Sequence, residues 1–290
     1  MESQKISAVI ICCNEEENIV RCIQSLLPLT DDIVVVDSGS SDNTVLYARV
    51  FGARVFQREW TGYSDQKNFG NEQALHPFIL SLDADECLSP ELLESIRREM
   101  LNPASAVYEF EFLTSWAGCF VHHGSWSGDR HCRLFDKRRI SWGGQVHEGL
   151  QMNGCVAQRL QGKIYHYTAV SKSYYREKMT RYAFIFAQNR KREQRFCPFW
   201  KKYLSAGMRF LKDYVIKRGF LAGRTGWEIA CEETRYTFLK YKWSQRNQAA
   251  LTTGDQNGMP GTAPKPEPAV SREEHSHNGL FLYSLHCCSR

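Results

Sequence analysis

The sequence predicts an α/β fold with a doubly wound parallel sheet, and three observations support it. Short apolar runs of strand length recur at residues 6–13, 32–37, 55–56 and 78–82. Apolar residues at helical spacing separate these runs, as between residues 19 and 27. The runs are apolar throughout instead of alternating, which is typical of strands that helices cover on both faces. Strands and helices that alternate in this way indicate a parallel sheet.

The connections between the predicted strands carry helix and turn signals. Asn14 is expected to cap the first helix, with the glutamates at residues 15–17 in its first turn, where the helix dipole favours acids. Residues 38–42 form a predicted turn before a second helix, and residues 62–75 form a third.

The second half of the sequence is less regular, and the chain divides into three predicted parts. Residues 1–168 form the first domain, in which residues 107–116 and 131–135 are further predicted strands. Residues 169–247 are expected to form a basic amphipathic helical region that completes the fold. Residues 248–290 begin with a stretch rich in Gly, Pro, Thr and charge, and we expect a disordered tail.

Three carboxylates follow the fourth predicted strand at Asp83, Asp85 and Glu86. In an open α/β sheet the ligand crevice lies outside the carboxyl ends of the strands. Carboxylate oxygens suit Mg²⁺ or Mn²⁺, and Mg²⁺ is usually held by one or two carboxylates together with substrate phosphates. We therefore predict that Asp83 and Asp85 hold a divalent cation. The alternative is a solvated turn before the helix that Ser89-Pro90 opens.

Polar clusters also end the first two predicted strands, at Asn14 and Glu15 and at Asp37. Because the carboxyl ends of parallel strands meet at one edge of a sheet, these clusters are expected to converge with Asp83 and Asp85 on a nucleotide site. No glycine-rich phosphate loop follows the first strand, which argues against a dinucleotide dehydrogenase or a P-loop NTPase. A diphosphate held through a metal ion fits the residues that are present.

Residues 9–16, 33–44 and 83–86 together resemble family 2 glycosyltransferases of the GT-A fold. Residues 60–68 and 143–148 more narrowly resemble the bacterial lipopolysaccharide inner-core β-1,4-glucosyltransferases. The resemblance spans about residues 5 to 245. It implies a GT-A fold, that of the nucleotide-diphospho-sugar transferases, with a doubly wound mixed sheet and a C-terminal helical appendage.

The resemblance implies an inverting, metal-dependent enzyme that uses a UDP-sugar. It assigns the metal to Asp83 and Asp85, with Mg²⁺ or Mn²⁺ as the ion. The residues that it places around the nucleotide sugar are Asn14, Glu15, Asp37, Ser38, Lys67, Asp83 and Arg133. Of these, Lys67 and Arg133 are candidates to neutralise the leaving diphosphate, with ordinary surface cations as the alternative.

An inverting transfer needs a base that takes the proton of the acceptor hydroxyl, and a carboxylate is the usual choice. We predict Glu148 as this base, with His147 orienting it or binding the acceptor, and Asp129 as the second candidate. A salt bridge or a structural histidine in a loop is the alternative. A zinc site at Cys119, His122, His123, His131 and Cys132 is disfavoured, because the spacings match no common zinc pattern.

The charge of the chain is uneven although its net value is only +5. Between residues 171 and 246, Lys and Arg outnumber Asp and Glu by roughly three to one, and aromatic residues lie between them. Basic amphipathic helices with aromatic anchors are suited to an anionic membrane surface. The predicted contacts are 190–192, 201–202 and 217–218, with Phe196, Phe199 and Trp200 between them. A helical packing layer is the alternative, and no nucleic-acid-binding module is present.

No apolar run is long enough to cross a bilayer, and the 11 cysteines are scattered behind no signal peptide. We therefore expect a cytoplasmic protein, peripheral on the inner face of the inner membrane. The leading hypothesis is a hexosyltransferase that moves a sugar, glucose first, from a UDP-sugar to the inner-core heptose of lipopolysaccharide. The alternatives are a transferase of the same fold for another lipid-linked or capsule glycan, and an inactive sugar-nucleotide-binding protein.

Overall fold

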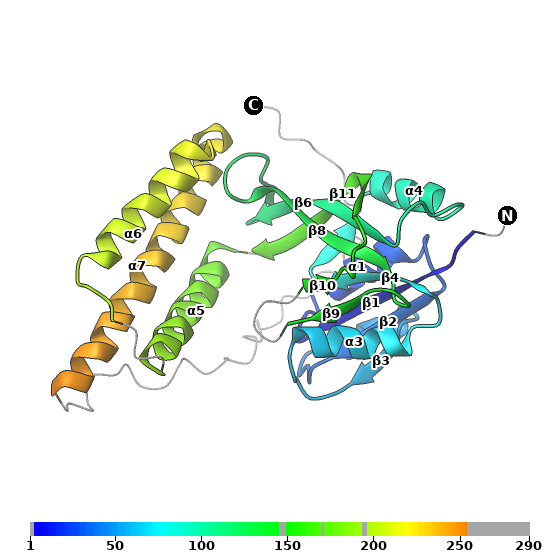
Figure 1. Cartoon of the computed structure of the whole chain (residues 1–290), viewed down its shortest axis with the longest axis horizontal. Coiled ribbons are helices and arrows are strands. Elements are labelled where there is room, and N and C mark those ends of the chain that lie inside the picture. Colours follow the sequence, from blue (N-terminus) through cyan, green and yellow to red (C-terminus); the bar gives the residue numbers. More distant parts are fainter. Residues whose placement is uncertain (1–2, 145–148, 170, 193–195, 254–290) are drawn as a thin grey trace, which may run out of the picture.

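The computed structural model describes residues 3–144, 149–169, 171–192 and 196–253, with side chains as far as Arg246. Within these residues a nine-stranded mixed sheet carries helices on both faces, and three long helices lie beside it (Figure 1). The strand order is β3-β2-β1-β4-β8-β6-β11-β5, with β7 paired to β6. The predicted α/β class and the mixed sheet that the resemblance implied are confirmed.

The first half of the sheet is parallel, as predicted. Its elements are β1 (Ile6–Cys12), α1 (Ile19–Leu26), β2 (Asp32–Asp37), α2 (Thr44–Val50), β3 (Arg54–Gln57), α3 (Tyr63–Gln73) and β4 (Phe78–Asp83). In register, Ile10 of β1 lies between Val35 of β2 and Leu82 of β4. The carboxyl ends of these strands therefore reach one edge together.

The second half of the sheet is mostly antiparallel. Its elements are β5 (Glu86–Leu88), α4 (Pro90–Glu99), β6 (Val107–Trp116), β7 (Cys119–Phe120), β8 (Ser127–Asp136), β9 (Ser141–Gly143), β10 (Gly149–Gln151) and β11 (Gln158–Ala169). Strand β8 pairs antiparallel with both β4 and β6. It begins at Ser127, four residues before the predicted strand at 131–135, and so extends past the end of β4. Strands β9 and β10 form a separate pair.

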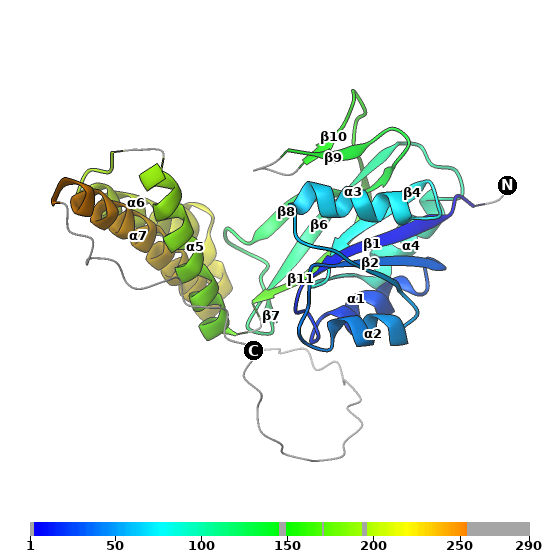
Figure 2. The same cartoon turned by 90° about the horizontal axis from the view of Figure 1, so that it is seen from below.

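Alternate residues of the central strands serve two cores. Ala8 and Ile10 pack with α1, α2 and α4, whereas Val9 and Ile11 pack on the side of α3 and β9. Figure 2 shows α3 on one face of the sheet and α1 and α2 on the other. Helix α3 lies so close to β1 that a Cβ added at Gly70 would sit 2.4 Å from Val9 Cγ1. A larger residue at this position would push the helix away from the sheet.

The helical region follows β11 directly. It consists of α5 (Lys172–Arg192), α6 (Lys201–Phe210), the π-helix η1 (Leu211–Ile216), the 3₁₀ helix η2 (Gly219–Ala222) and α7 (Gly223–Thr253). Helices α5 and α6 both pack on α7, through ring pairs such as Phe184 with Trp243 and Tyr203 with Phe238. Helix α7 continues six residues past the predicted boundary at 248. The predicted tail from 254 onward lies outside the described residues.

The predicted helix cap at Asn14 is wrong. Helix α1 begins at Ile19 after Asn18, and Asn14 has a left-handed backbone with a φ of 56°. The loop after β2 holds this segment instead. Ser41 N donates to Asn14 Oδ1 over 2.8 Å, and Glu15 N donates to Thr44 Oγ1 over 2.8 Å. Contacts between two loops therefore override the local helix signal.

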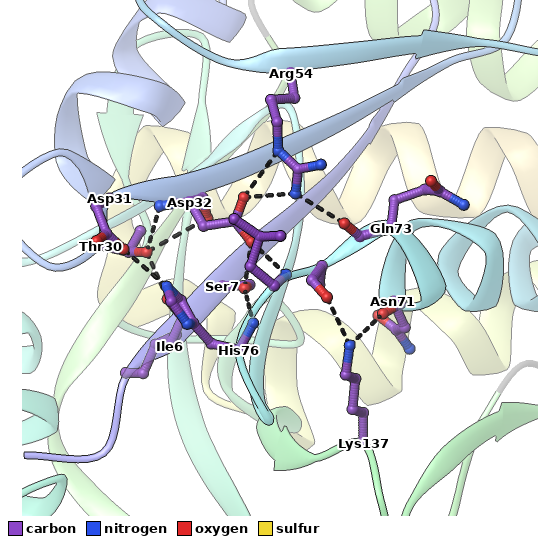
Figure 3. Close-up of polar contacts among 12 residues, drawn as sticks. Ile6, Ser7, Thr30, Asp31, Asp32, Arg54, Asn71, Gln73, His76 and Lys137 are labelled. Atoms are coloured by element: carbon purple, nitrogen blue, oxygen red, sulfur yellow. Dashed lines mark hydrogen bonds and ion pairs between the residues drawn. The ribbon is translucent and has the colours of Figure 1, made fainter.

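A buried charge network lies at the opposite end of the parallel strands (Figure 3). Asp32 accepts hydrogen bonds from Leu75 N at 2.7 Å and from Arg54 Nη2 at 2.6 Å, and Ser7 Oγ also donates to it. Burial raises the pKa of Asp32, but these donors together with the Arg54 charge lower it overall. The carboxylate thus joins β1, β2, β3 and the segment before β4.

Asp32→Ala is expected to lower the free energy of unfolding by about 3 kcal/mol, because it leaves Arg54 and the buried donors without their acceptor. Urea unfolding followed by circular dichroism measures the change. Asp31→Ala is the matched control, since Asp31 is exposed and pairs with Lys5 and His76 at the surface. Equal unfolding midpoints for the two variants would contradict the structural role of Asp32.

Candidate functional site

The acids after β4 lie where the chain reverses into β5. Asp83 ends β4, and the backbone N of Asp83 donates to Glu86 Oε2 over 3.0 Å. Strand β5 pairs with β11 so that Glu86 lies opposite His166. The turn is therefore fixed from both sides, and it holds Asp83 and Asp85 at the carboxyl edge of the parallel strands.

Two cations from distant elements converge on Asp83. Arg133 Nη2, on β8, lies 3.1 Å from Asp83 Oδ2 and 2.6 Å from Glu86 Oε1. Lys67 Nζ, on α3, lies 3.3 Å from Asp83 Oδ1, and the Lys67 side chain is fully buried. Burial raises the pKa of Asp83, but Arg133 and Lys67 outweigh it and lower the pKa to about 2. Asp83 is therefore a carboxylate at any working pH.

Lys67 reaches this position inside α3 with its ammonium 4.5 Å from the centre of the Trp142 ring. An amphipathic helix normally turns lysine outward, so a fully buried lysine on α3 points to a task at the site. Lys67 and Arg133 both lie at the acidic turn, and their predicted role in neutralising the leaving diphosphate stays a prediction. Both cations pair with Asp83. They keep this carboxylate ionised, and they also offset the negative charge of the acidic turn.

Asp85 has a different neighbour. His166 Nε2, on β11, lies 3.3 Å from Asp85 Oδ2. Burial lowers the pKa of His166, but Asp85, Glu86 and Asp83 raise it overall. Sequence reasoning missed His166, because its place opposite Glu86 depends on the pairing of strands almost 80 residues apart. Asp85, the partner of His166, was predicted as a site residue. The residues around His166 carry no motif that would indicate a functional histidine.

The acidic turn offers one carboxylate to a divalent cation. Asp83 is committed to Arg133 and Lys67, which leaves Asp85 as the acid for a metal and His166 nitrogen beside it. One or two carboxylates with phosphates and water are the usual partners of Mg²⁺, so Asp85 fits such a cation. Among the described residues no three His, Cys, Asp or Glu side chains are grouped to hold a metal without a substrate.

The predicted nucleotide residues brace the loops after β1 and β2. Asp37 is buried and accepts from Gly39 N at 3.1 Å, from Ser40 N at 3.0 Å and from Gln57 Nε2 at 3.3 Å. Ser38 Oγ accepts from Gln66 Nε2 over 3.1 Å. Asp37 and Asn14 therefore shape the edges of the predicted nucleotide site through the loops that they hold.

Glu15 lies close to the acidic turn. Burial raises its pKa to about 7, while a hydrogen bond from Asn18 Nδ2 lowers it and the charge of Asp85 raises it further. A carboxyl whose pKa is raised by folding stabilises the fold at low pH, and the stability is lost as pH rises through that pKa. Glu15 therefore costs stability above about pH 7.

Glu15→Gln is expected to raise the melting temperature above about pH 7 and to leave it nearly unchanged at about pH 3, where the carboxyl is neutral in both the folded and the unfolded protein. Glutamine keeps an oxygen for Asn18, so only the charge is removed. Thermal unfolding across this pH range measures the effect. A difference in melting temperature that stays constant with pH would contradict the raised pKa.

The predicted base and its neighbour, Glu148 and His147, lie outside the described residues. The second candidate, Asp129, is exposed on the first part of β8. Because β8 runs antiparallel to β4 and extends past it, Asp129 belongs to the same edge as Asp83. His131 on this strand contacts Phe112, as does His166.

One family model and several known proteins are similar to this chain. Residues 7–117 match the family model for glycosyl transferase family 2. These residues are similar to a family 2 glycosyltransferase domain. An uncharacterised glycosyltransferase of Rickettsia typhi is 29% identical over 77% of this chain and 80% of its own length. A lipopolysaccharide core biosynthesis glycosyltransferase of Rhizobium meliloti is 28% identical over 81% of this chain and 89% of its own.

Among solved structures, a glucosyl-3-phosphoglycerate synthase of Mycobacterium tuberculosis in complex with Mn²⁺, UDP and glucosyl-3-phosphoglycerate is similar. It is 25% identical with a TM-score of 0.33, and the match covers 39% of this chain and 44% of that chain. The protein is a transferase, and the residues that match the family model include Lys67, Asp83 and Asp85. Arg133 and His166 come from beyond residue 117, so the site needs the second half of the sheet.

Proposed function

We propose that this family 2 glycosyltransferase moves a hexose, with glucose as the first donor to test, from a UDP-sugar to the inner-core heptose of lipopolysaccharide with inversion. The observation that carries the proposal is the turn after β4. There Arg133 and Lys67 keep Asp83 ionised, and Asp85 stands beside His166 at the edge. The acceptor is suggested by the Rhizobium meliloti relative, whose name states lipopolysaccharide core biosynthesis.

Each group has a separate task in this proposal. The loops held by Asn14 and Asp37 border the nucleoside, and Asp85 anchors Mg²⁺ or Mn²⁺ next to Asp83. When bound, the cation neutralises the charge of the leaving diphosphate. Glu148 takes the proton of the acceptor hydroxyl as it attacks the anomeric carbon, which gives inversion. Lys67 and Arg133 hold the acidic turn rigid and offset its charge.

A screen of donors against acceptors tests the proposal. Purified protein is incubated with a panel of UDP-hexoses and with deacylated core oligosaccharide, and mass spectrometry detects an acceptor that has gained one hexose. Transfer from one UDP-hexose to the core heptose is the expected result. Transfer only to another lipid-linked or capsule glycan would show that the acceptor is that glycan and not the core heptose. Binding of UDP-sugars with neither transfer nor hydrolysis would indicate an inactive binding protein.

We further propose that the helical region rests on the anionic inner face of the inner membrane, as an acceptor anchored in lipid requires. Helix α6 and η1 expose an apolar stripe that consists of Leu204, Met208, Leu211 and Val215, between 45% and 57% exposed. Lys212, Lys217 and Arg218 are exposed around it. An exposed apolar face bordered by cations suits an anionic lipid surface. No helix of the described residues is long and apolar enough to cross a membrane.

The contacts of the predicted basic clusters support one of them over the others for this proposal. Lys201 lies with its ammonium 5.3 Å from the centre of the Tyr241 ring and is turned toward α7. Arg190 donates to the Phe196 carbonyl over 3.0 Å. The cluster at 217–218 lies beside the stripe and is therefore the stronger candidate for lipid contact.

Vesicle co-sedimentation tests the membrane proposal. The protein should bind vesicles that contain phosphatidylglycerol at low salt and be released at high salt, and it should not bind phosphatidylcholine alone. Each cation contributes about 1 kcal/mol, so changing Lys212, Lys217 and Arg218 to Gln should weaken binding on the order of 10²-fold. The same change at Arg98, Arg138 and Arg159 of the sheet domain is the control. Binding that ignores lipid charge and salt would contradict the proposal.

A further inference from the structure

Helix α5 is held along one face by α7 and by two tryptophans of the sheet domain. Tyr175 packs against Trp116 and Trp126, with ring centres 5.0 and 5.2 Å away, and its hydroxyl donates to Glu233 of α7. Arg176 pairs with Glu232 of the same helix. In both overall views α5 lies on the side of α6 and α7 that faces the sheet (Figures 1 and 2). These contacts fix the orientation of the first half of α5.

The face of α5 turned away from these contacts forms a pocket. Its lining residues recur at helical spacing and are Tyr174, Glu177, Lys178, Arg181 and Tyr182. Both tyrosines are substantially exposed, at 51% and 42%. Within the described part of the chain, Lys178 and Arg181 form no ion pair or hydrogen bond. Two cations against the single carboxylate of Glu177 leave the pocket positively charged.

The pocket lies within electrostatic reach of the acidic turn. Lys178 lowers the pKa of Glu15 against the larger effect of burial. Burial raises the pKa of Tyr174, and the charges of Glu15 and Asp85 raise it further. Helix α5 also begins only a few residues after His166, which contacts Asp85. The pocket is therefore on the side of the sheet domain that carries Glu15 and the acidic turn.

We infer that this pocket binds the sugar acceptor and that the acceptor is an anionic glycan, held by Lys178 and Arg181 between the rings of Tyr174 and Tyr182. The inference rests on the proposed function and adds to it the charge class of the acceptor and the residues that select it. Aromatic rings provide flat apolar surfaces for the C–H faces of a sugar, and guanidinium and ammonium groups bind phosphate or carboxylate.

The test compares Lys178→Gln/Arg181→Gln with the matched control Lys191→Gln/Arg192→Gln at the other end of α5. Deacylated, phosphorylated core oligosaccharide is the probe, and its binding is measured by calorimetry without donor and its transfer by kinetics. The pocket variant should weaken binding and raise the acceptor KM by about tenfold for each cation lost. The kcat at saturating acceptor and the KM of the UDP-sugar should stay unchanged, and the control should match the parent.

Two treated probes separate the sources of the negative charge. Phosphatase treatment of the probe removes its phosphates, and carboxyl reduction removes its carboxylates. The treatment that abolishes the difference in probe binding between parent and variant identifies the anionic group that the pocket binds. Equal binding of the untreated probe by parent and pocket variant would overturn the inference while leaving the proposed function intact. If the variant binds the probe more weakly but the parent transfers no sugar, the pocket binds an anionic glycan and the proposed function is refuted.

Discussion

Asp85→Asn is expected to reduce sugar transfer by about 10²–10³-fold, which is typical for the loss of one charged group that acts on a developing negative charge. Asparagine keeps the size of the side chain and one oxygen but removes the charge that attracts a divalent cation. Asp83 cannot replace it, because Arg133 and Lys67 already occupy its oxygens. A strong chelator should reduce the parent enzyme to the same level.

The control for this variant is Asp31→Asn at the opposite edge of the sheet. Asp31 is exposed and pairs only with surface groups, so transfer should persist at the parental rate. The unfolding midpoint of Asp85→Asn should also stay close to that of the parent, because the Asp85 side chain contributes nothing to the apolar cores. Full activity in the presence of chelator would refute the role of a metal at Asp85.

Glu148→Gln is expected to lower turnover by about 10²–10⁴-fold while UDP-sugar binding persists. Glutamine preserves shape and hydrogen bonding but cannot accept the proton of the acceptor hydroxyl. Single-turnover kinetics together with equilibrium binding of UDP measures both effects. Glu148 lies outside the described residues, so the prediction rests on the sequence motif at 143–148.

Asp129→Asn serves as the comparison for the base, since Asp129 is the other candidate and lies exposed on β8. Asp129→Asn should retain most of the parental turnover if Glu148 is the base. Normal turnover of Glu148→Gln together with loss in Asp129→Asn would move the role to Asp129.

The parallel half of the fold could be predicted from sequence because its signals are local. Strands buried on both faces are apolar throughout, so β1, β2 and β4 could be located to within one residue from their apolar runs. The positions of Lys67 and Arg133 followed from resemblance rather than from pattern. Their convergence on one carboxylate depends on α3 crossing the sheet and on β8 pairing with β4.

The features that the sequence did not predict depend on contacts between distant segments. His166 meets Asp85 only because β11 pairs with β5. Asn14 adopts a left-handed backbone because Ser41 and Ser40, on another loop, bind it in place of a helix turn. The pocket on α5 could be predicted only if it were known which face of this basic helix packs against α7. Periodicity gives the helix but not its partner.

The central claim is that the carboxyl edge of the parallel strands binds a nucleotide sugar through a divalent cation anchored at Asp85. Isothermal titration of UDP into the parent protein, with and without Mn²⁺, tests it most directly. We predict binding that requires Mn²⁺ in the parent and in Asp31→Asn, and that Asp85→Asn abolishes. UDP binding that is equally tight without metal and in Asp85→Asn would contradict the claim.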